Sequence, residues 1–474
     1  MPDSLIQTVA VIGSGTMGAG IAEVAASAGQ QVLLYDISPE ATQRAIDALR
    51  GRLAARVARG RLTSPQQEQI LGRIHAVSDI AALAAADLVI EAASEKLEVK
   101  KALFSTLGDI CPPRTLLTSN TSSISITAIA AGVRHPERVA GLHFFNPAPV
   151  MKLVEVVSGM ATSAEIVDQL CQCVTQWGKR AVRCRSTPGF IVNRVARAFY
   201  AEGWRALEEQ VAAPEAIDTA LREGGGFPMG PLALTDLIGQ DVNFAVTCSV
   251  FNAFWQERRF LPSLYQQELV LAGRLGKKSA HGVYRWPEGA PEAACYPPVP
   301  EHAQAQACTT SGDAVTLDGV LLLPTDGETA QSKASRLQRP VVLVDHSEGE
   351  VVAVAAAAGN RLAETEKAIR WLQLQGKRVL LVADYPGLLV SRTVVMLVNE
   401  ALDALQKGVA SEEDIDTAMR LGVNYPHGPL AWGERLGWRR VLQLLENLQR
   451  HYGEERYRPC SLLRQRALLE SCYE

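Results

Sequence analysis

Two ionisable side chains, His143 and Glu155, lie twelve residues apart in otherwise apolar stretches of the chain. An imidazole titrates near neutral pH, so it can accept the hydroxyl proton when a secondary alcohol is oxidised. A carboxylate flanked by apolar strand residues needs a donor or a cation as its partner. Because the chain turns back through Pro147 and Pro149, Glu155 can reach the ring, orient it and stabilise its charged form. The alternatives are a buried structural histidine and an ion pair of Glu155 with Lys152, which the alternation of strand side chains disfavours.

A glycine-rich loop, Gly13-Ser14-Gly15-Thr16-Met17-Gly18, follows a predicted strand and opens a predicted helix. This context is typical of a dinucleotide-binding turn. Gly13 permits the tight turn, Gly15 lets the backbone approach a pyrophosphate, and Gly18 lets helix and strand pack closely. The free N–H groups and the dipole at the helix amino terminus then favour phosphate.

Asp36 ends the next predicted strand, 18 residues after Gly18. A carboxylate there can accept both ribose hydroxyls of an adenosine and would repel a 2′-phosphate. The sequence therefore favours NAD over NADP as cofactor. The alternative is that Asp36 merely caps the helix that starts at Ser38.

The elements that must position these side chains alternate between strand and helix over the first part of the chain. We expect strands at 8–12, 31–35, 88–92, 116–119, 139–144 and 153–157, and helices at 20–28, 38–58 and 96–110. This alternation predicts a doubly wound sheet, with ligands bound at the carboxyl ends of its strands. His143 stands at such an end.

Helical patterns take over after Pro188, first at 189–210 and then at 214–223, and part of this region is repeated. Three motifs recur at a constant offset of 198 residues: Pro188-Gly189-Phe190 as Pro386-Gly387-Leu388, Ile217–Ala220 as Ile415–Ala418, and Gly230–Ala233 as Gly428–Ala431. An ungapped match of this kind indicates a duplicated helical domain.

Between the copies we expect strands at 315–324, 340–345, 351–355 and 378–383 and helices at 330–337 and 364–374, after a proline-rich linker near 287–300. The predicted fold is an α/β Rossmann-type domain (1–186), an all-α domain (187–286), a linker and small α/β module (287–383) and a second all-α copy (384–474). The small module has no glycine fingerprint, so we interpret it as a degenerate relative of the first domain that binds no cofactor.

Composition limits the possible partners. A chain of 474 residues is too long for one core and predicts about three domains. With 47 Lys and Arg against 51 Asp and Glu, the formal net charge of −4 disfavours nucleic-acid or membrane partners and favours a small molecule. Nine cysteines without a C-x-x-C pair predict a reduced, cytoplasmic protein, and Cys171 and Cys173 lack the nearby histidines of a metal site. The apolar residues 8–12 run directly into the glycine loop, so we expect neither a leader nor a membrane span.

Taken together, these motifs resemble the L-3-hydroxyacyl-CoA dehydrogenase family over residues 8–286. The resemblance rests on five segments: Val11–Gly20, Ser119–Ser123, Gly141–Pro147 (G-L-H-F-F-N-P), Met151–Val157 and Thr187–Arg194 (T-P-G-F-I-V-N-R). It implies NAD-dependent oxidation of a (3S)-3-hydroxyacyl-CoA to the 3-oxoacyl-CoA, with His143 and Glu155 as the catalytic pair. The tandem helical copies resemble the members that oxidise 3-hydroxyadipyl-CoA in bacterial phenylacetate breakdown. A short-chain 3-hydroxybutyryl-CoA dehydrogenase is the alternative.

The resemblance also assigns roles to further residues. It places Ser122 and Asn193 at the substrate oxygen, where neutral groups do not compete with His143 for the proton. Their alternatives are a cap of a helix at 124–131 for Ser122 and a surface amide for Asn193, whose equivalent in the second copy is Ser391. Positions near the cofactor are Glu95, Lys100, Asn120, Ser122, Asn146 and Lys278. Positions near the coenzyme A phosphates are Arg52, Arg56 and Arg59. Glu95 and Lys100 could equally be an exposed helical pair, and the arginines a solvated helix face.

Two other functions are weighed against this one. The β-hydroxyacid dehydrogenases of the 6-phosphogluconate type share a Rossmann domain followed by helices, but they use a lysine as base. A non-catalytic, crystallin-like NAD-binding protein is the second, and the intact set around His143 disfavours it.

Three features remain open at the level of the sequence. Arg194, Arg197 and Arg222 are the candidates to hold a terminal carboxylate of the acyl chain, and helix register alone does not choose between them. We expect the second helical copy to be structural and to pack against the first as family members do across a dimer. A homo-oligomer of the whole chain stays open.

Overall fold

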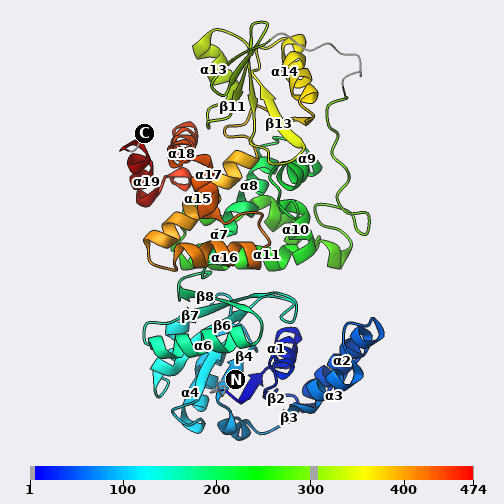
Figure 1. Cartoon of the computed structure of the whole chain (residues 1–474), viewed down its shortest axis with the longest axis vertical. Helices are drawn as coiled ribbons and strands as arrows, with labels where there is room; N and C mark the ends of the chain where they lie inside the picture. Colours follow the sequence, from blue (N-terminus) through cyan, green and yellow to red (C-terminus); the bar gives the residue numbers. More distant parts are fainter. Residues whose placement is uncertain (1–5, 299–307, 473–474) are drawn as a thin grey trace. The chain divides into compact units, whose positions relative to one another are not determined.

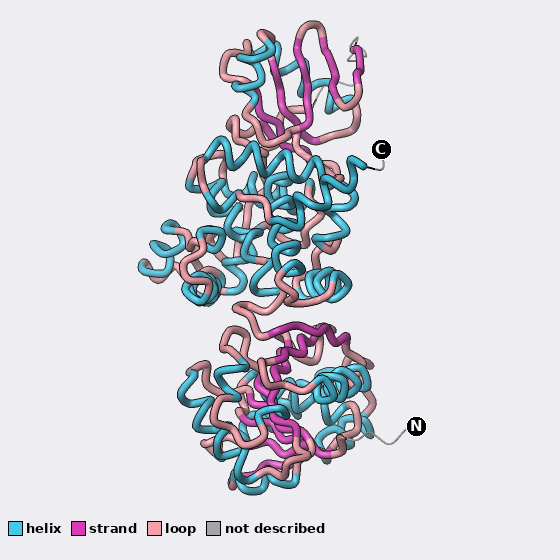
Figure 2. Tube along the Cα trace, turned by 90° about the vertical axis from the view of Figure 1, so that its left-hand side faces the viewer, coloured by secondary structure: helices cyan, strands magenta, loops and turns pink. Residues whose placement is uncertain are grey.

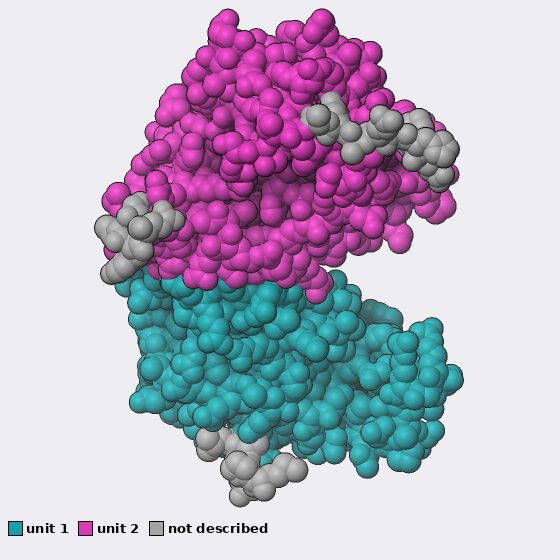
Figure 3. Space-filling view, turned by 45° about the horizontal axis from the view of Figure 1, so that its top comes forward, with its two compact units in different colours: residues 1–192, 408–423 teal, residues 193–407, 424–474 magenta. Residues whose placement is uncertain are grey.

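The structure is a computed structural model that describes residues 6–298 and 308–472, and it divides into two compact units (Figure 3). Unit 1 comprises residues 1–192 and 408–423, and unit 2 comprises residues 193–407 and 424–474. These limits differ from the expected domain boundaries, because a segment of the second helical copy folds with the first domain and the small module folds with the helices. The last two positions of the expected linker, 299 and 300, lie outside the described residues.

Unit 1 is built on an eight-stranded sheet with helices packed on it (Figures 1 and 2), in the strand order β3-β2-β1-β4-β5-β6-β7-β8. The strands are β1 Thr8–Ile12, β2 Gln31–Tyr35, β3 Ile74–Val77, β4 Leu88–Glu91, β5 Leu116–Ser119, β6 Val139–Phe144, β7 Leu153–Ser158 and β8 Arg180–Arg185. The α-helices are α1 Thr16–Ser27, α2 Pro39–Ala58, α3 Ser64–Gly72, α4 Leu97–Ile110, α5 Ile126–Ala130, α6 Ala164–Gln176 and α16 Glu412–Gly422, and the 3-10 helices are η1 Ile80–Ala85 and η2 Pro136–Arg138. The predicted doubly wound domain is confirmed, while β3, α3 and β8 were not predicted.

The neighbours from β3 to β6 pair in parallel, whereas β7 runs antiparallel to β6. β6 and the first five residues of β7 are buried, as expected for strands covered on both faces. In the antiparallel register His143 stands directly opposite Glu155. Directly opposite residues project to the same face at close range, so the register itself brings the imidazole and the carboxylate together.

Helix α16, from the second helical copy, packs on β7 and β8 within unit 1. The backbone N–H of Arg185 donates to the carbonyl of Val409 over 2.8 Å, and Arg180 pairs with Glu413 at 2.6 Å. A Cβ added to Gly422 would lie 2.8 Å from the side chain of Leu153, so the approach is close. The duplication therefore supplies a helix that covers the edge of the cofactor domain.

Unit 2 combines both helical copies with a six-stranded sheet. The first copy contains α7 Val192–Val195, α8 Arg197–Glu208, α9 Pro214–Thr219, η3 Ala220–Gly224, α10 Pro231–Ile238, α11 Gln240–Ala253, η4 Arg258–Phe260, α12 Leu264–Leu271 and η5 Lys277–Ser279. The second contains α15 Val390–Gln406, α17 Pro429–Leu436, α18 Trp438–Tyr452, η6 Glu455–Tyr457 and α19 Ser461–Cys472.

The two copies pack together through α8 and α15 with reciprocal ion pairs. Arg194 bonds Glu400 at 2.6 Å, and its equivalent 198 residues later, Arg392, bonds Glu202 at 2.6 Å. All four side chains are buried. Reciprocal contacts of this kind are the signature of a two-fold interface, here built within one chain. The expectation that the copies pack against each other agrees with this geometry.

The small module contains β9 Thr309–Ser311, β10 Ala314–Leu317, β11 Val320–Pro324, β12 Val341–Val344, β13 Val351–Ala356, β14 Arg378–Leu381, α13 Ala330–Leu337 and α14 Leu362–Leu374. Its sheet has the order β14-β13-β12-β11-β10-β9. The single strand expected at 315–324 is instead a hairpin, β10 and β11, because Asp318 and Gly319 both take positive φ angles, 46° and 87°, in a tight turn.

Asp345 joins this module to the second helical copy. It accepts hydrogen bonds from the backbone N–H groups of Leu389, Val390 and Ser391, and from the Ser391 hydroxyl at 2.7 Å. Burial raises the pKa of Asp345, although these hydrogen bonds lower it. Ser391 is thus fully engaged in holding the module.

Among the described residues, no helix is long and apolar enough to cross a membrane. The same residues contain no group of three or more His, Cys, Asp or Glu side chains suited to hold a metal ion. The eight cysteines whose side chains are described are all free.

Candidate active site

The imidazole of His143 and the carboxylate of Glu155 form a buried pair in unit 1. Glu155 Oε2 lies 2.7 Å from His143 Nδ1, and their residues are 0% and 6% exposed. Glu155 Oε1 accepts the backbone N–H groups of Ile191 (3.1 Å) and Val192 (3.0 Å), at the start of α7. Glu155 therefore fixes the ring and the amino terminus of a helix at once, while the alternative partner, Lys152, is exposed.

The ring of His143 packs against two aromatic side chains. Phe145 lies 4.6 Å and Phe190 5.9 Å from it, between ring centroids. Within the described part of the chain, Nε2 makes no hydrogen bond. With Nδ1 engaged by a carboxylate, the proton is held on Nδ1, and Nε2 presents a lone pair that can accept a proton.

Asn120, at the end of β5, ties this edge of the sheet together. Its side-chain oxygen accepts the backbone N–H of Phe144 at 2.8 Å, next to His143. Asn120 therefore fixes the backbone that carries the imidazole, in addition to the cofactor role that the sequence suggested.

The glycine loop has the geometry that a dinucleotide requires. Gly13 has a φ of +96°, and a Cβ at Gly18 would lie 1.8 Å from the carbonyl oxygen of Gly13, so neither position tolerates a side chain. A Cβ at Gly15 would meet nothing within 4 Å. Gly15 precedes α1, whose first turn has no acidic residue and no side-chain cap, so no side chain competes with a phosphate for the N–H groups of this turn. These residues fit the pyrophosphate of NAD.

Asp36 is held beside this loop. It accepts hydrogen bonds from the Ser14 N–H (2.7 Å) and hydroxyl (2.8 Å) and from the Ser38 N–H (3.1 Å). Burial alone would raise the pKa of Asp36, but the hydrogen bonds from Ser14 and Ser38 outweigh it and lower the pKa. The cap of α2 is the Ser38 side chain, which accepts from the N–H of Ala41, so the interpretation of Asp36 as a mere cap is wrong.

Sequence reasoning missed Glu91, which organises the next group of polar residues. Its fully buried carboxylate binds Lys100 Nζ at 2.7 Å through both oxygens and accepts the Ser119 hydroxyl at 2.6 Å. Glu95 lies 3.4 Å from the same Lys100. Because Lys100 is only 2% exposed, the exposed-pair interpretation of Glu95 and Lys100 is wrong. The sequence signal that could have found it is a glutamate, Glu91, at the end of the apolar strand β4.

Glu95 in turn holds Ser122. Its Oε1 accepts the Ser122 N–H at 3.1 Å and the hydroxyl of Thr121 at 3.0 Å. Ser122 is half-buried, and α5 is capped by Ser125, so the alternative of Ser122 as a helix cap is wrong. The Ser122 hydroxyl is therefore not used to cap this helix.

A cavity in unit 1 is lined in part by arginines of α2. Glu23, buried on α1, lies 2.9 Å from Arg56 and 3.6 Å from Arg52. These residues line a cavity of about 550 Å³. Its complete lining is Thr16, Gly20, Glu23, Arg52, Arg56, Arg61, Asn146, Pro147, Ala148, Pro149 and Val150. Arg61 thus lines this cavity, whereas Arg59, which the resemblance placed near the coenzyme A phosphates, does not.

The remaining expected site residues belong to unit 2. Asn193 is half-buried at the start of the first helical copy. Lys278 pairs with Asp241 at 2.6 Å. Unit 2 thus contains Asn193, which the resemblance places at the substrate oxygen, and Lys278, which it places near the cofactor.

Comparisons with known proteins identify the family. Residues 8–187 match the family model "3-hydroxyacyl-CoA dehydrogenase, NAD binding domain", and residues 189–286 and 387–471 each match "3-hydroxyacyl-CoA dehydrogenase, C-terminal domain". The chain belongs to the 3-hydroxyacyl-CoA dehydrogenase family. The double match also confirms the duplication. Residues 322–386 match "3-hydroxybutyryl-CoA dehydrogenase reduced Rossmann-fold domain", in agreement with a degenerate module.

Relatives of this dehydrogenase include one of nearly equal length. The chain is 71% identical over 470 residues to the "3-hydroxyadipyl-CoA dehydrogenase" of Escherichia coli K12, covering 99% of each chain. It is 42% identical over 283 residues to a "Probable 3-hydroxybutyryl-CoA dehydrogenase" of Bacillus subtilis, covering 60% of this chain and 98% of that one.

Among solved structures, a "3-hydroxybutyryl-CoA dehydrogenase" from Escherichia coli K12 superposes with a TM-score of 0.97 at 71% identity, over 99% of this chain and 100% of that one. The dehydrogenase is therefore an enzyme that oxidises 3-hydroxyacyl-CoA with NAD. Family membership sets aside the 6-phosphogluconate-type alternative, and the 71% identity to a dehydrogenase of nearly equal length sets aside the crystallin-like one.

Proposed function

We propose that this dehydrogenase oxidises (3S)-3-hydroxyadipyl-CoA to 3-oxoadipyl-CoA with His143 as the base. The observation that carries the proposal is the buried His143–Glu155 pair, whose Nδ1–Oε2 distance of 2.7 Å leaves Nε2 to meet the substrate. The 71% identity to a protein named for 3-hydroxyadipyl-CoA supports the acyl group. As the resemblance implies, we assign the reaction to bacterial phenylacetate breakdown.

In this mechanism His143 Nε2 takes the proton from the C3 hydroxyl while the C3–H bond breaks. NAD, when bound, would supply the acceptor for the hydride of that bond. Glu155 keeps the Nδ1 proton in place and stabilises the imidazolium that forms, because its carboxylate is buried and already aligned with the ring. In the reverse direction the imidazolium returns its proton to the alkoxide oxygen.

Ser122 and Asn193 would hold the substrate oxygen with neutral hydrogen bonds. Glu95 fixes the backbone of Ser122, and Glu91 fixes Lys100, which lies next to Glu95. We assign Glu95, Lys100, Asn120, Asn146 and Lys278 to the cofactor, together with Asp36 and the loop from Gly13 to Gly18.

The cavity beside α2 would receive the coenzyme A phosphates. Arg52, Arg56 and Arg61 line it, and guanidinium groups suit phosphate because they donate paired hydrogen bonds. Glu23 fixes two of them, which reduces the rotamer entropy lost on binding. We place this reaction in the cytoplasm, since free cysteines are typical of a reducing compartment.

The experiment compares kcat/KM for 3-hydroxyadipyl-CoA and 3-hydroxybutyryl-CoA, followed by NADH absorbance, in the wild type and in His143→Ala. We expect the wild type to prefer the adipyl substrate. The variant should lose about 10²- to 10⁴-fold in kcat and keep its NAD affinity, because His143 does not contact the glycine loop. A preference for the butyryl substrate would favour the short-chain alternative, and near-normal turnover of the variant would remove His143 from the mechanism.

A further inference from the structure

Arg197 is a buried arginine in unit 2 that lacks an acidic partner. It is 5% exposed, and among the described residues no carboxylate oxygen lies within 4.0 Å of its guanidinium. Its Nε donates to the carbonyl oxygen of Asn193 and its Nη1 to the hydroxyl of Thr247, both over 3.0 Å, and its carbon Cζ lies 4.6 Å from the centroid of the Tyr200 ring. Burial lowers the pKa of Arg197. A buried cation without a counter-charge is costly, so it indicates an anionic ligand.

The other two arginines considered for the acyl carboxylate are already neutralised. Arg194 bonds Glu400 and Asp403, each at 2.6 Å, in the interface between the helical copies. Arg222 is exposed and pairs with Glu223 at 2.6 Å. Of the three candidates, Arg197 alone is both buried and without an acid.

Arg197 stands at a suitable distance from the amide proposed to hold the substrate oxygen. It follows Asn193 by four residues across the junction of α7 and α8, where Ala196 keeps a helical backbone conformation, so the two lie about one helical turn apart, about 5 Å along the axis. In a six-carbon dicarboxylyl chain the far carboxylate is separated from C3 by three carbon–carbon bonds. That span is comparable to one turn.

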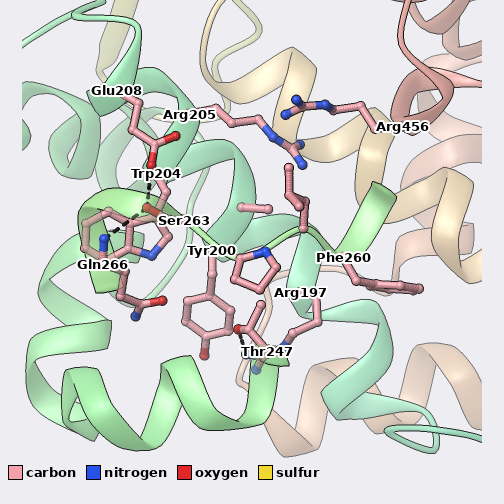
Figure 4. Close-up of a pocket in the computed structure, with 13 residues that line it drawn as sticks. Arg197, Tyr200, Trp204, Arg205, Glu208, Thr247, Phe260, Ser263, Gln266 and Arg456 are labelled. Carbon is pink, nitrogen blue, oxygen red and sulfur yellow. Dashed lines mark hydrogen bonds between the residues drawn. The ribbon is translucent and has the colours of Figure 1, made fainter. Parts of the chain in front are cut away.

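Open space adjoins Arg197. It lines a cavity of about 70 Å³ within unit 2, enough for several waters or for a carboxylate group. Figure 4 shows Arg197 and Thr247 at one end of the cavity and Arg205 and Arg456 at the other. Among the described residues that line it, the acid is Glu208, which is exposed and accepts the Ser263 hydroxyl.

Two of the residues that line the cavity have a buried hydrogen-bond donor without a partner among the described residues. Trp204 Nε1 and Arg205 Nη2 are buried and have no hydrogen-bond partner. Their residues are 2% and 6% exposed. Buried donors without a partner are rare in native proteins, and both of these belong to residues that line the same cavity as Arg197. Of the described residues that line this cavity, three are arginines, Arg197, Arg205 and Arg456, and one is an acid, Glu208, so its lining has the excess of positive side chains that a site for a carboxylate requires.

We propose that Arg197 binds the far carboxylate of a dicarboxylyl-CoA substrate and so determines the preference of this enzyme for that acyl class. This inference rests on the proposed function, because it assigns the residue that recognises the acid end of the same substrate. Thr247 and the Asn193 carbonyl position the guanidinium, which leaves Nη2 for the ligand.

The test measures a selectivity ratio, kcat/KM for 3-hydroxyadipyl-CoA divided by kcat/KM for 3-hydroxyhexanoyl-CoA. The two acyl chains have six carbons each and differ only at the carboxylate end. In Arg197→Gln we expect the ratio to fall about 10- to 100-fold, the usual effect of losing a hydrogen bond between charged groups. The matched control is Arg222→Gln, which removes an exposed arginine of the same helical copy and should keep the wild-type ratio.

A purely structural role of Arg197 would lower both kcat/KM values together through Asn193 and leave the ratio unchanged, which would overturn the inference. If Arg197→Gln does not fold, the variant Thr247→Val tests the role of Arg197 instead. It removes one of the two bonds that aim the guanidinium, and we expect a fall in the same ratio of about threefold to tenfold. An unchanged ratio in Thr247→Val would then reject the proposal.

Failure of the proposed function has a different signature. A wild-type enzyme that does not prefer 3-hydroxyadipyl-CoA over 3-hydroxyhexanoyl-CoA contradicts the substrate assignment itself. A wild-type preference that survives in Arg197→Gln contradicts only the role of Arg197.

Discussion

Replacing Glu155 by glutamine is the most direct perturbation of the proposed catalytic pair, because it removes the charge and keeps the shape. In the wild type Oε2 faces His143 Nδ1 at 2.7 Å, and Oε1 accepts the N–H groups of Ile191 and Val192. A glutamine can place only one oxygen. Whichever way the amide turns, one of these two sets of contacts meets an N–H donor.

The backbone set decides the orientation. Turning the amide nitrogen toward Ile191 and Val192 would leave two buried N–H groups without an acceptor, at a cost of about 1–3 kcal/mol each. The amide oxygen therefore stays with the backbone, and the amide N–H₂ faces His143 Nδ1. His143 Nδ1 must then accept a hydrogen bond from the amide, so the imidazole proton moves to Nε2. Nε2 is the atom that has to act as the base. The wrong tautomer cannot take the hydroxyl proton.

We expect kcat of Glu155→Gln to fall about 10³- to 10⁴-fold, the effect known for a carboxylate-to-amide change beside a catalytic imidazole. This corresponds to about 4–5.5 kcal/mol of transition-state stabilisation. NAD affinity, measured by titration of the protein's fluorescence, should stay within about twofold, since neither the glycine loop nor Asp36 is touched.

The control is Glu165→Gln, which removes an exposed charge in the first turn of α6 and should leave kcat unchanged. The assay follows NADH formation at saturating substrate. If Glu155→Gln retains kcat within tenfold of the wild type while binding NAD normally, the tautomer argument and the role of Glu155 are wrong.

Two further predictions concern the cofactor loop and the helical unit. Gly15→Ala should fold like the wild type, because its Cβ meets no atom within 4 Å, yet bind NAD at least about tenfold more weakly, because the methyl group occupies the space of the pyrophosphate. Gly18→Ala should instead lower the melting temperature, because its Cβ would collide with the Gly13 carbonyl. Normal NAD binding by a well-folded Gly15→Ala would contradict this division of roles. Burial raises the pKa of Asp218 to about 6 despite its hydrogen bonds from Tyr284 and the backbone. A raised folded-state pKa contributes stability that is complete below pH 4, the unfolded value, and is lost as the pH rises through 6, by about 3 kcal/mol in total. Melting temperatures measured from pH 4 to pH 7 should therefore show a smaller decline in Asp218→Asn than in the wild type, and parallel curves would refute the assignment.

The contact between His143 and Glu155 could be predicted because local pattern determines it. An antiparallel return fixes which residues of two adjacent strands face each other, and the alternation of strand side chains favoured His143 over Lys152 as the partner of Glu155. The glycine loop was predictable for the same reason, since its requirements are set by backbone geometry within six residues.

Other features depend on contacts between distant segments. A lysine in the amphipathic helix α4 looks exposed in sequence, and only the packing of α4 against β4 shows that Lys100 is buried on Glu91. Arg194 and Glu400 are separated by 206 residues, so neither predicts the other. The hairpin at Asp318-Gly319 could have been predicted from the sequence, because this dipeptide is a strong turn signal inside an apolar run.

The two copies use the same carboxylate-to-helix contact differently, in agreement with the proposal that the first copy serves catalysis and the second is structural. In the first copy a strand-borne acid, Glu155, accepts the backbone N–H groups of Ile191 and Val192 and still has an oxygen for His143. In the second copy Asp345 accepts the equivalent groups, 198 residues later, but its other oxygen is taken by the Ser391 N–H and hydroxyl. A serine at the position of Asn193 thus consumes the acceptor that a catalytic histidine would need. In both copies a carboxylate binds the backbone N–H groups at the start of a helix. Glu155 keeps one oxygen for His143, whereas both oxygens of Asp345 are used by the second copy.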